Sequence, residues 1–128
     1  MNYVLDTHVL IWYFLGSKRL KRSFKQAIDD CRRRGGRLLV PTIVLAEALD
    51  IAEKQRVIFD FSLMYRLICS EPGFEVVGFS PEIFSEAIKL RKIKELHDRI
   101  IVATARFYGA GIITKDRIIR ESKEVETL

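Results

Sequence analysis

The sequence has only two cysteines, Cys31 and Cys69, and their positions exclude several classes of small protein. Neither cysteine belongs to a CxxC or Cys/His pattern, so a structural zinc site is disfavoured. In a reducing compartment, two free and half-buried thiols are the expected state. The spacing alone leaves open whether the two could pair.

Long apolar segments are also missing. The longest purely apolar run, Val9 to Leu15, is far shorter than the roughly 20 residues that a membrane-spanning helix needs. No basic segment precedes this run and Asp6 interrupts its start, so we expect neither a signal peptide nor a membrane anchor. The expected location is therefore cytoplasmic.

The sequence contains no internal repeat, low-complexity segment or linker. Its length of 128 residues is that of a single domain, and an apolar fraction of 48% is enough for a hydrophobic core. We therefore expect one domain over residues 1–128.

Positive charge is concentrated in one segment. The chain carries a net charge of +5, which favours an anionic partner. Nine basic residues lie between Lys18 and Arg37, against only Asp29 and Asp30. The segment fits the solvated face of an amphipathic helix, and it also fits a phosphate-contacting patch around Arg32, Arg33 and Arg34. The two interpretations are compatible.

Short apolar strands alternate with helical patterns along the whole chain. The predicted strands cover residues 2–5, 37–40, 74–79 and 111–114, with a possible last edge strand at 124–128. The predicted helices cover residues 7–15, 20–34, 42–54, 57–68, 98–108 and 116–122, with one more opening at Pro81 after Ser80. This alternation predicts an α/β sandwich whose central sheet of four to five strands is mostly parallel.

Four carboxylates lie in or beside strongly apolar segments: Asp6, Glu47, Asp98 and Asp116. A buried carboxylate is costly, so it usually pairs, takes up a proton or holds a cation. Ligands of open parallel sheets bind beyond the carboxyl ends of the strands. Asp6 ends the first predicted strand, Asp116 follows the fourth, Asp98 opens a buried helix, and Glu47 lies in the second turn of a helix. We therefore expect the four acids to meet at one edge of the sheet.

Simpler roles fit each acid taken singly. The three aspartates could all be helix N-caps. Glu47 could pair with Lys54 or reach solvent. If the four acids do form one site, their all-oxygen donor set favours magnesium or manganese over zinc.

Other polar residues near the acids are assigned no part in the site. We expect His8 to pack beside it or support it, and His97 to lie in a turn. Asp50 and Asp60 also lie among apolar residues, but neither follows a strand. Asp60 is expected to pair with Arg56, one helical turn earlier.

The order of these motifs resembles the PIN domain, and most of all the VapC-type toxins of type II toxin–antitoxin modules. The resemblance rests on Asp6-Thr7-His8-Val9-Leu10-Ile11-Trp12, on Glu47, on Asp98-Arg99-Ile100-Ile101-Val102-Ala103-Thr104-Ala105 and on Thr114-Lys115-Asp116. It covers essentially the whole chain and implies a PIN-like three-layer sandwich. VapC-type chains often close with an apolar strand ending in Trp, whereas residues 126–128 read Glu-Thr-Leu, so the last strand is expected to be short.

What the resemblance implies is a Mg²⁺-dependent endoribonuclease, with Mn²⁺ as a plausible substitute. The acidic quartet Asp6, Glu47, Asp98 and Asp116 would be both catalytic and metal-binding, with Thr7 and Thr114 in supporting positions. Arg32, Arg33 and Arg34 would then be candidates for contacts to the RNA backbone. The implied partners are RNA, a second copy of the chain through its helices around residues 43–68, and an antitoxin that could present an Arg or Lys to the acids.

Two other classes fit less well. A catalytically idle PIN fold that binds RNA or acts as a scaffold is the main alternative, although all four acids are present. A haloacid-dehalogenase-type phosphatase would need Asp-x-Asp, whereas Thr7 and His8 follow Asp6. A receiver domain would need paired acids after the first strand.

Overall fold

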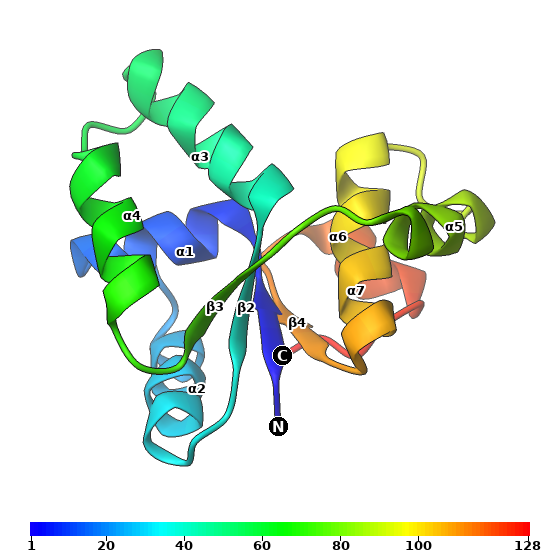
Figure 1. Ribbon diagram of the computed structural model, residues 1–128, viewed down its shortest axis with the longest axis horizontal. Coiled ribbons are helices and arrows are strands. Elements are labelled where there is room, and N and C mark those ends of the chain that lie inside the picture. The colour runs from blue at the N-terminus through cyan, green and yellow to red at the C-terminus, as the bar shows by residue number, and fades with distance from the viewer.

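A parallel sheet of four strands forms the centre of the computed structural model, which describes all residues from 1 to 128 (Figure 1). The strands are β1 (Tyr3–Leu5), β2 (Leu38–Pro41), β3 (Phe74–Val77) and β4 (Gly111–Ile113), in the order β3-β2-β1-β4. In the register, Val4 of β1 pairs with Leu39 on one side and with Ile112 on the other. These three residues are fully buried, as expected for a parallel sheet that helices cover on both faces.

Seven helices flank the sheet and produce the predicted three-layer sandwich. They are α1 (Thr7–Leu15), α2 (Arg22–Arg33), α3 (Thr42–Glu53), α4 (Phe61–Ser70), α5 (Pro81–Lys89), α6 (Leu96–Tyr108) and α7 (Arg117–Ser122). Figure 1 shows α1 to α4 on one side of the sheet and α5 to α7 on the other. None of these helices is long and apolar enough to cross a membrane.

Helix α6 is apolar because it is buried, as its sequence indicated, and both α6 and α1 end at a glycine. In α6 every side chain from Ile100 to Ala105 is buried, since this helix packs against β1, β4, α3 and α5. Its last turn ends at Gly109, whose φ of 63° is in the left-handed region that glycine adopts without strain. Helix α1 ends in the same way at Gly16.

The structure differs from the sequence prediction at several boundaries. Residues 124–128 form one parallel bridge, Ile112 with Thr127, rather than a fifth strand. Helix α4 begins at Phe61 because Asp60 caps it by accepting a hydrogen bond from the backbone N–H of Leu63, so the predicted pair of Asp60 with Arg56 is wrong. Helix α6 begins two residues before Asp98, with Glu95 as its N-cap.

Candidate functional site: an acidic cluster at the carboxyl edge of the sheet

Asp6 and Asp116 are linked through the hydroxyl group of Thr114. Thr114 follows β4 and is fully buried, and its Oγ1 donates a hydrogen bond of 2.5 Å to Oδ2 of Asp6. The same Oγ1 accepts a hydrogen bond of 2.9 Å from the backbone N–H of Asp116. Because β1 and β4 are adjacent and parallel, their carboxyl ends place Asp6 and Asp116 at the same edge of the sheet.

Glu47 joins the cluster from α3. Its Oε1 accepts a hydrogen bond of 2.5 Å from Oγ1 of Thr7, which is buried in the first turn of α1. Nε2 of His97 lies 2.7 Å from the same Oε1, although the two atoms are not aligned as a regular hydrogen bond. Thr7 and Thr114 therefore connect three of the acids, Asp6, Glu47 and Asp116.

Two acids of the cluster, Asp98 and Asp6, have raised pKa values. Asp98 lies in the first turn of α6, its side chain is buried with 7% of the residue exposed, and it forms no salt bridge. Burial is the largest cause that raises the pKa of Asp98, and together with the nearby charges of Asp116, Glu95 and Asp6 it brings that pKa to about 7. The pKa of Asp6 is also raised by burial, although the hydrogen bonds from Thr114 and Thr7 oppose that rise. Like charges are thus held together here at an energetic cost.

No lysine or arginine of the chain forms an ion pair with any of the four acids. The salt bridges elsewhere in the molecule pair surface residues, and Glu47 has only His97. The uncompensated oxygen donors suit a hard divalent cation such as Mg²⁺ or Mn²⁺. In the present arrangement no three acidic, histidine or cysteine side chains are close enough to enclose one ion.

Two of the three aspartates are helix N-caps as well as members of the cluster. Asp6 and Asp116 are the N-caps of α1 and α7. In each case only Oδ1 accepts the capping hydrogen bond, from the backbone N–H of Thr7 or Ile119. Asp98 is not an N-cap. The alternative pair of Glu47 with Lys54 does not form, because Nζ of Lys54 lies 3.1 Å from Asp50.

The basic residues of α2 lie away from the acids. Helix α2 ends beside the amino ends of the strands, at the opposite edge of the sheet (Figure 1). Nε of Arg32 donates to the backbone carbonyl of Pro72, two residues before β3, and Arg33 pairs with Asp30. The structure therefore does not bring Arg32, Arg33 and Arg34 to the acidic cluster.

Several residues beside the cluster were not predicted to belong to it. His97 is part of the first turn of α6 rather than a turn residue, and its position directly before Asp98 was the available signal. Glu95 lies three residues before Asp98, so the two share a helix face. Trp12 and Lys115 line a hollow together with Asp6 and Asp116, and nothing in their spacing indicated that they would meet.

These features define an α/β protein with an acidic site at the carboxyl edge of its sheet, and the comparisons with known proteins name its family. Residues 3–124 match the PIN domain family, and the chain belongs to it. Ribonuclease VapC22 of Mycobacterium tuberculosis (strain ATCC 25618 / H37Rv) is 29% identical over 122 residues, which are 94% of this chain and 91% of that protein.

Two solved structures have the same fold. VapBC2 from Rickettsia felis, bound to a DNA fragment from its promoter, contains a chain that superposes with a TM-score of 0.77 at 17% identity, covering 100% of this chain and 98% of that one. A toxin–antitoxin complex from Klebsiella pneumoniae gives a TM-score of 0.71 at 23% identity, covering 98% and 95%. The resemblance to VapC-type PIN proteins and the predicted fold are thus confirmed.

Proposed function

We propose that this protein is a metal-dependent endoribonuclease and the toxin of a toxin–antitoxin pair. One observation carries the proposal: Asp6, Glu47, Asp98 and Asp116 come from four separate elements and gather at one sheet edge without a basic partner. Membership of the PIN family and the similarity to a ribonuclease support RNA as the substrate.

The proposed roles follow from the contacts of each acid. Asp6 and Asp98 would be direct ligands of Mg²⁺ or Mn²⁺, because their burial leaves them in most need of a cation. Asp116 and Glu47 would complete the ligand set or orient the attacking water. A divalent ion at this position supplies Lewis-acid stabilisation of charge that develops on the phosphoryl oxygens. Thr114 and Thr7 hold Asp6 and Glu47 in orientation through their hydroxyl groups.

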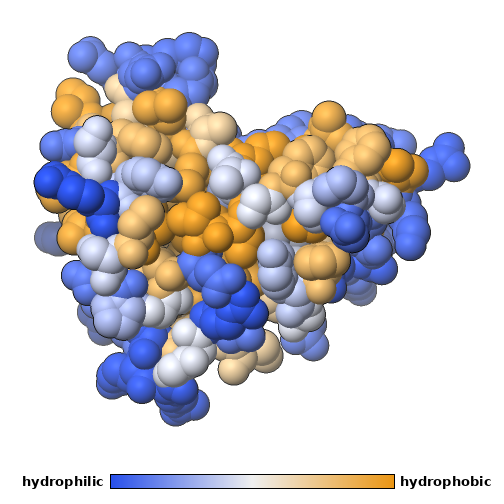
Figure 2. All heavy atoms as spheres, viewed as in Figure 1, coloured by the Kyte–Doolittle hydropathy of each residue, from blue (hydrophilic) through white to orange (hydrophobic).

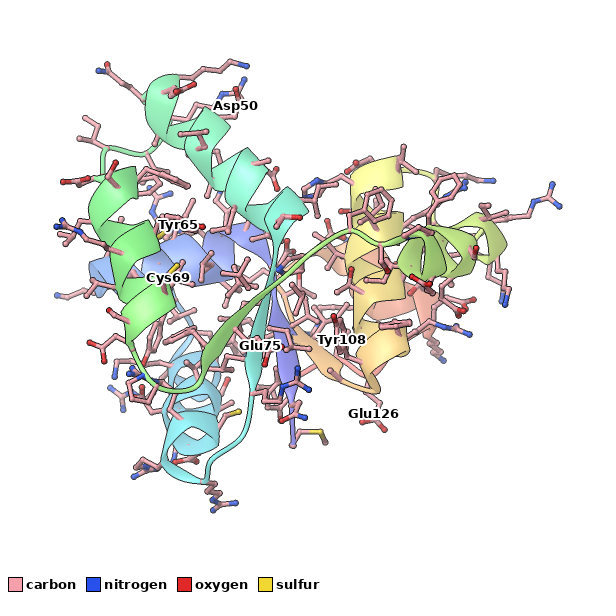
Figure 3. The ribbon with its side chains drawn as sticks, in the orientation of Figure 1. Asp50, Tyr65, Cys69, Glu75, Tyr108 and Glu126 are labelled. Atoms are coloured by element: carbon pink, nitrogen blue, oxygen red, sulfur yellow. The ribbon has the colours of Figure 1, made fainter.

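RNA cleavage in the presence of Mg²⁺ and of a chelator tests this proposal. We expect cleavage with the ion and none with the chelator, and we expect Asp6→Asn to abolish it because the change removes a charge and hardly alters volume. Glu126→Gln is the control, since Glu126 is exposed and lies beside the amino end of β4, away from the acidic cluster (Figure 3). Equal cleavage with and without the ion would contradict the metal mechanism.

A catalytically idle module that only binds RNA is the alternative function. It predicts that RNA binds but stays uncut with Mg²⁺ and with the chelator, for the natural chain and for Asp6→Asn alike. The same experiment therefore separates the two functions.

An antitoxin is the proposed regulatory partner. The two structural neighbours are complexes of a toxin with an antitoxin, and a cluster of acids without a cation can accept an Arg or Lys from such a partner. Expression of this chain alone should arrest growth of the host cell, and coexpression with the product of an adjacent small gene should restore it. Growth arrest that Asp6→Asn does not relieve would contradict the toxin function.

A second copy of the chain is the other proposed partner. Leu63 and Tyr65 on α4 are exposed. Figure 2 shows apolar side chains gathered near the centre of the viewed face, between α4 and α6 in Figure 1. Leu63→Lys should convert a dimer to a monomer in light scattering, whereas Lys123→Ala on the far side should not.

A further inference from the structure

A groove beside α1 is lined by aromatic and basic side chains and leads away from the acidic cluster. It consists of two adjoining hollows of about 230 Å³ and 390 Å³, and both are lined by His8 and Trp12. The first hollow also contains Asp6, Asp116 and Lys115. The second contains Glu47 and extends to Arg19 and Arg56. We call this feature the α1 groove.

The floor that the two hollows share is aromatic. His8 is exposed and Trp12 is half-buried, and their ring centroids lie 5.4 Å apart at an angle of 49°. Nζ of Lys115 lies 4.9 Å from the centroid of the Trp12 ring. The ammonium group therefore rests on an aromatic face, although the carboxylate of Asp116 is the next residue in the chain. The face of the Trp12 ring that contacts this ammonium group is flat and borders the groove.

The basic residues of the groove have no acidic partner within the protein. Lys115, Arg19 and Arg56 take part in none of the salt bridges, and Asp50, which also lines the second hollow, is paired with Lys54. The basic segment of α2 is different, because Lys25 pairs with Asp29, and Arg33 pairs with Asp30. Free cations beside an aromatic face are the combination that binds single-stranded nucleic acid, since phosphates meet the cations and a base stacks on the ring.

We propose that the α1 groove binds an unpaired nucleotide next to the bond that is cut, with its base stacked on Trp12 and beside His8. The base takes the place over the ring that the ammonium of Lys115 occupies, and Lys115 moves to an adjacent phosphate. Arg19 and Arg56 contact phosphates further along the strand. Trp12 is thus a positioning residue that selects single-stranded RNA, because a base within a duplex cannot leave its stack at no cost. This inference rests on the proposed ribonuclease function.

The tryptophan itself provides the assay, because Trp12 is the only tryptophan of the chain. The full-length Asp98→Asn variant, which should bind without cutting, is titrated with an unstructured RNA of about ten nucleotides in Mg²⁺. Stacking should quench the Trp12 fluorescence with the same midpoint as the anisotropy of a dye-labelled RNA. The same sequence as a duplex should produce no quenching. Binding seen by anisotropy without quenching would overturn the inference.

Two variants measure how much Trp12 and Lys115 contribute to RNA binding. In the same Asp98→Asn background, Trp12→Leu removes the stacking face but keeps an apolar side chain, and should raise the Kd by about 5- to 150-fold. Lys115→Gln should lower the slope of log K against log salt by about 0.7, the value for one phosphate contact on a single strand. Phe107→Ala, at an exposed aromatic residue near the far end of α6, is the control and should change neither quantity.

RNA with one abasic nucleotide separates stacking from general damage to the fold. If the base stacks on Trp12, the abasic site and Trp12→Leu should each weaken binding, and their combination should add nothing further. Additive effects would overturn the inference while leaving the nuclease function intact. Absence of RNA cleavage by the unmodified protein, with no RNA binding, would overturn the proposed function and this inference together.

Discussion

Replacing Asp98 with Asn should make the metal-free protein more stable while it abolishes cleavage. Burial and the neighbouring acids raise the pKa of Asp98 from 3.8 to about 7. Each pKa unit corresponds to about 1.4 kcal/mol, so the ionised carboxylate destabilises the folded state by at most ~4 kcal/mol. Water can reach the cluster from the open edge of the sheet and screens part of this energy. We therefore expect Asp98→Asn to add about 2 kcal/mol to the free energy of unfolding at pH 8.

The direction of the pKa shift of Asp98 determines how this stability difference changes with pH. A raised carboxyl pKa means that the folded state holds a proton that the unfolded state has released, so folding is favoured by acid. The advantage of Asp98→Asn over the natural chain should therefore be absent below about pH 4, grow as the pH rises toward 7, and stay constant above that value.

Urea unfolding at pH 5 and pH 8 in the presence of a chelator measures this difference. Asp50→Asn is the control, because it removes only an exposed pair with Lys54 and should change stability by less than about 1 kcal/mol. Mg²⁺ at about 100 times its Kd should stabilise the natural chain by about 2.7 kcal/mol and the variant much less. A variant that is less stable, or a difference that does not change with pH, would refute the argument that like charges are confined at this site.

Further predictions concern the support of the site, the core and the basic segment. Thr114→Val removes the donor to Asp6, so the pKa of Asp6 should rise and the acidic limb of the cleavage profile should move to higher pH, with a rate loss of roughly tenfold that Thr114→Ser should largely restore. Ile101→Ala, at a fully buried position, should cost about 2–5 kcal/mol in thermal or urea unfolding, whereas Ile118→Ala at an exposed one should stay within about 0.5 kcal/mol. If RNA extends only along the α1 groove, neutralising Arg33 and Arg34 should leave the salt dependence of binding unchanged, and a lower salt slope would instead assign these residues to the RNA backbone.

The sequence determined the architecture because its signals were local. Alternating apolar strands and amphipathic helices follow from side-chain periodicity, and Gly16 and Gly109 mark helix ends that need a left-handed residue. The four acids could also be placed at one edge, since parallel strands end on the same side of a sheet. Whether each aspartate was an N-cap or part of an acidic cluster remained open, and Asp6 and Asp116 are N-caps that also lie in the cluster.

Tertiary structure alone decided the contacts between residues distant in sequence. The hydrogen bond of Thr114 with Asp6 spans 108 positions, and the one between Thr7 and Glu47 spans 40, so no local pattern could predict either. Burial also depends on every packed element, which is why the raised pKa of Asp98 emerged only from the folded chain. The strand order β3-β2-β1-β4 set the distances: it brought Trp12 and Lys115 together beside the acids, and it left the basic end of α2 at the opposite edge of the sheet.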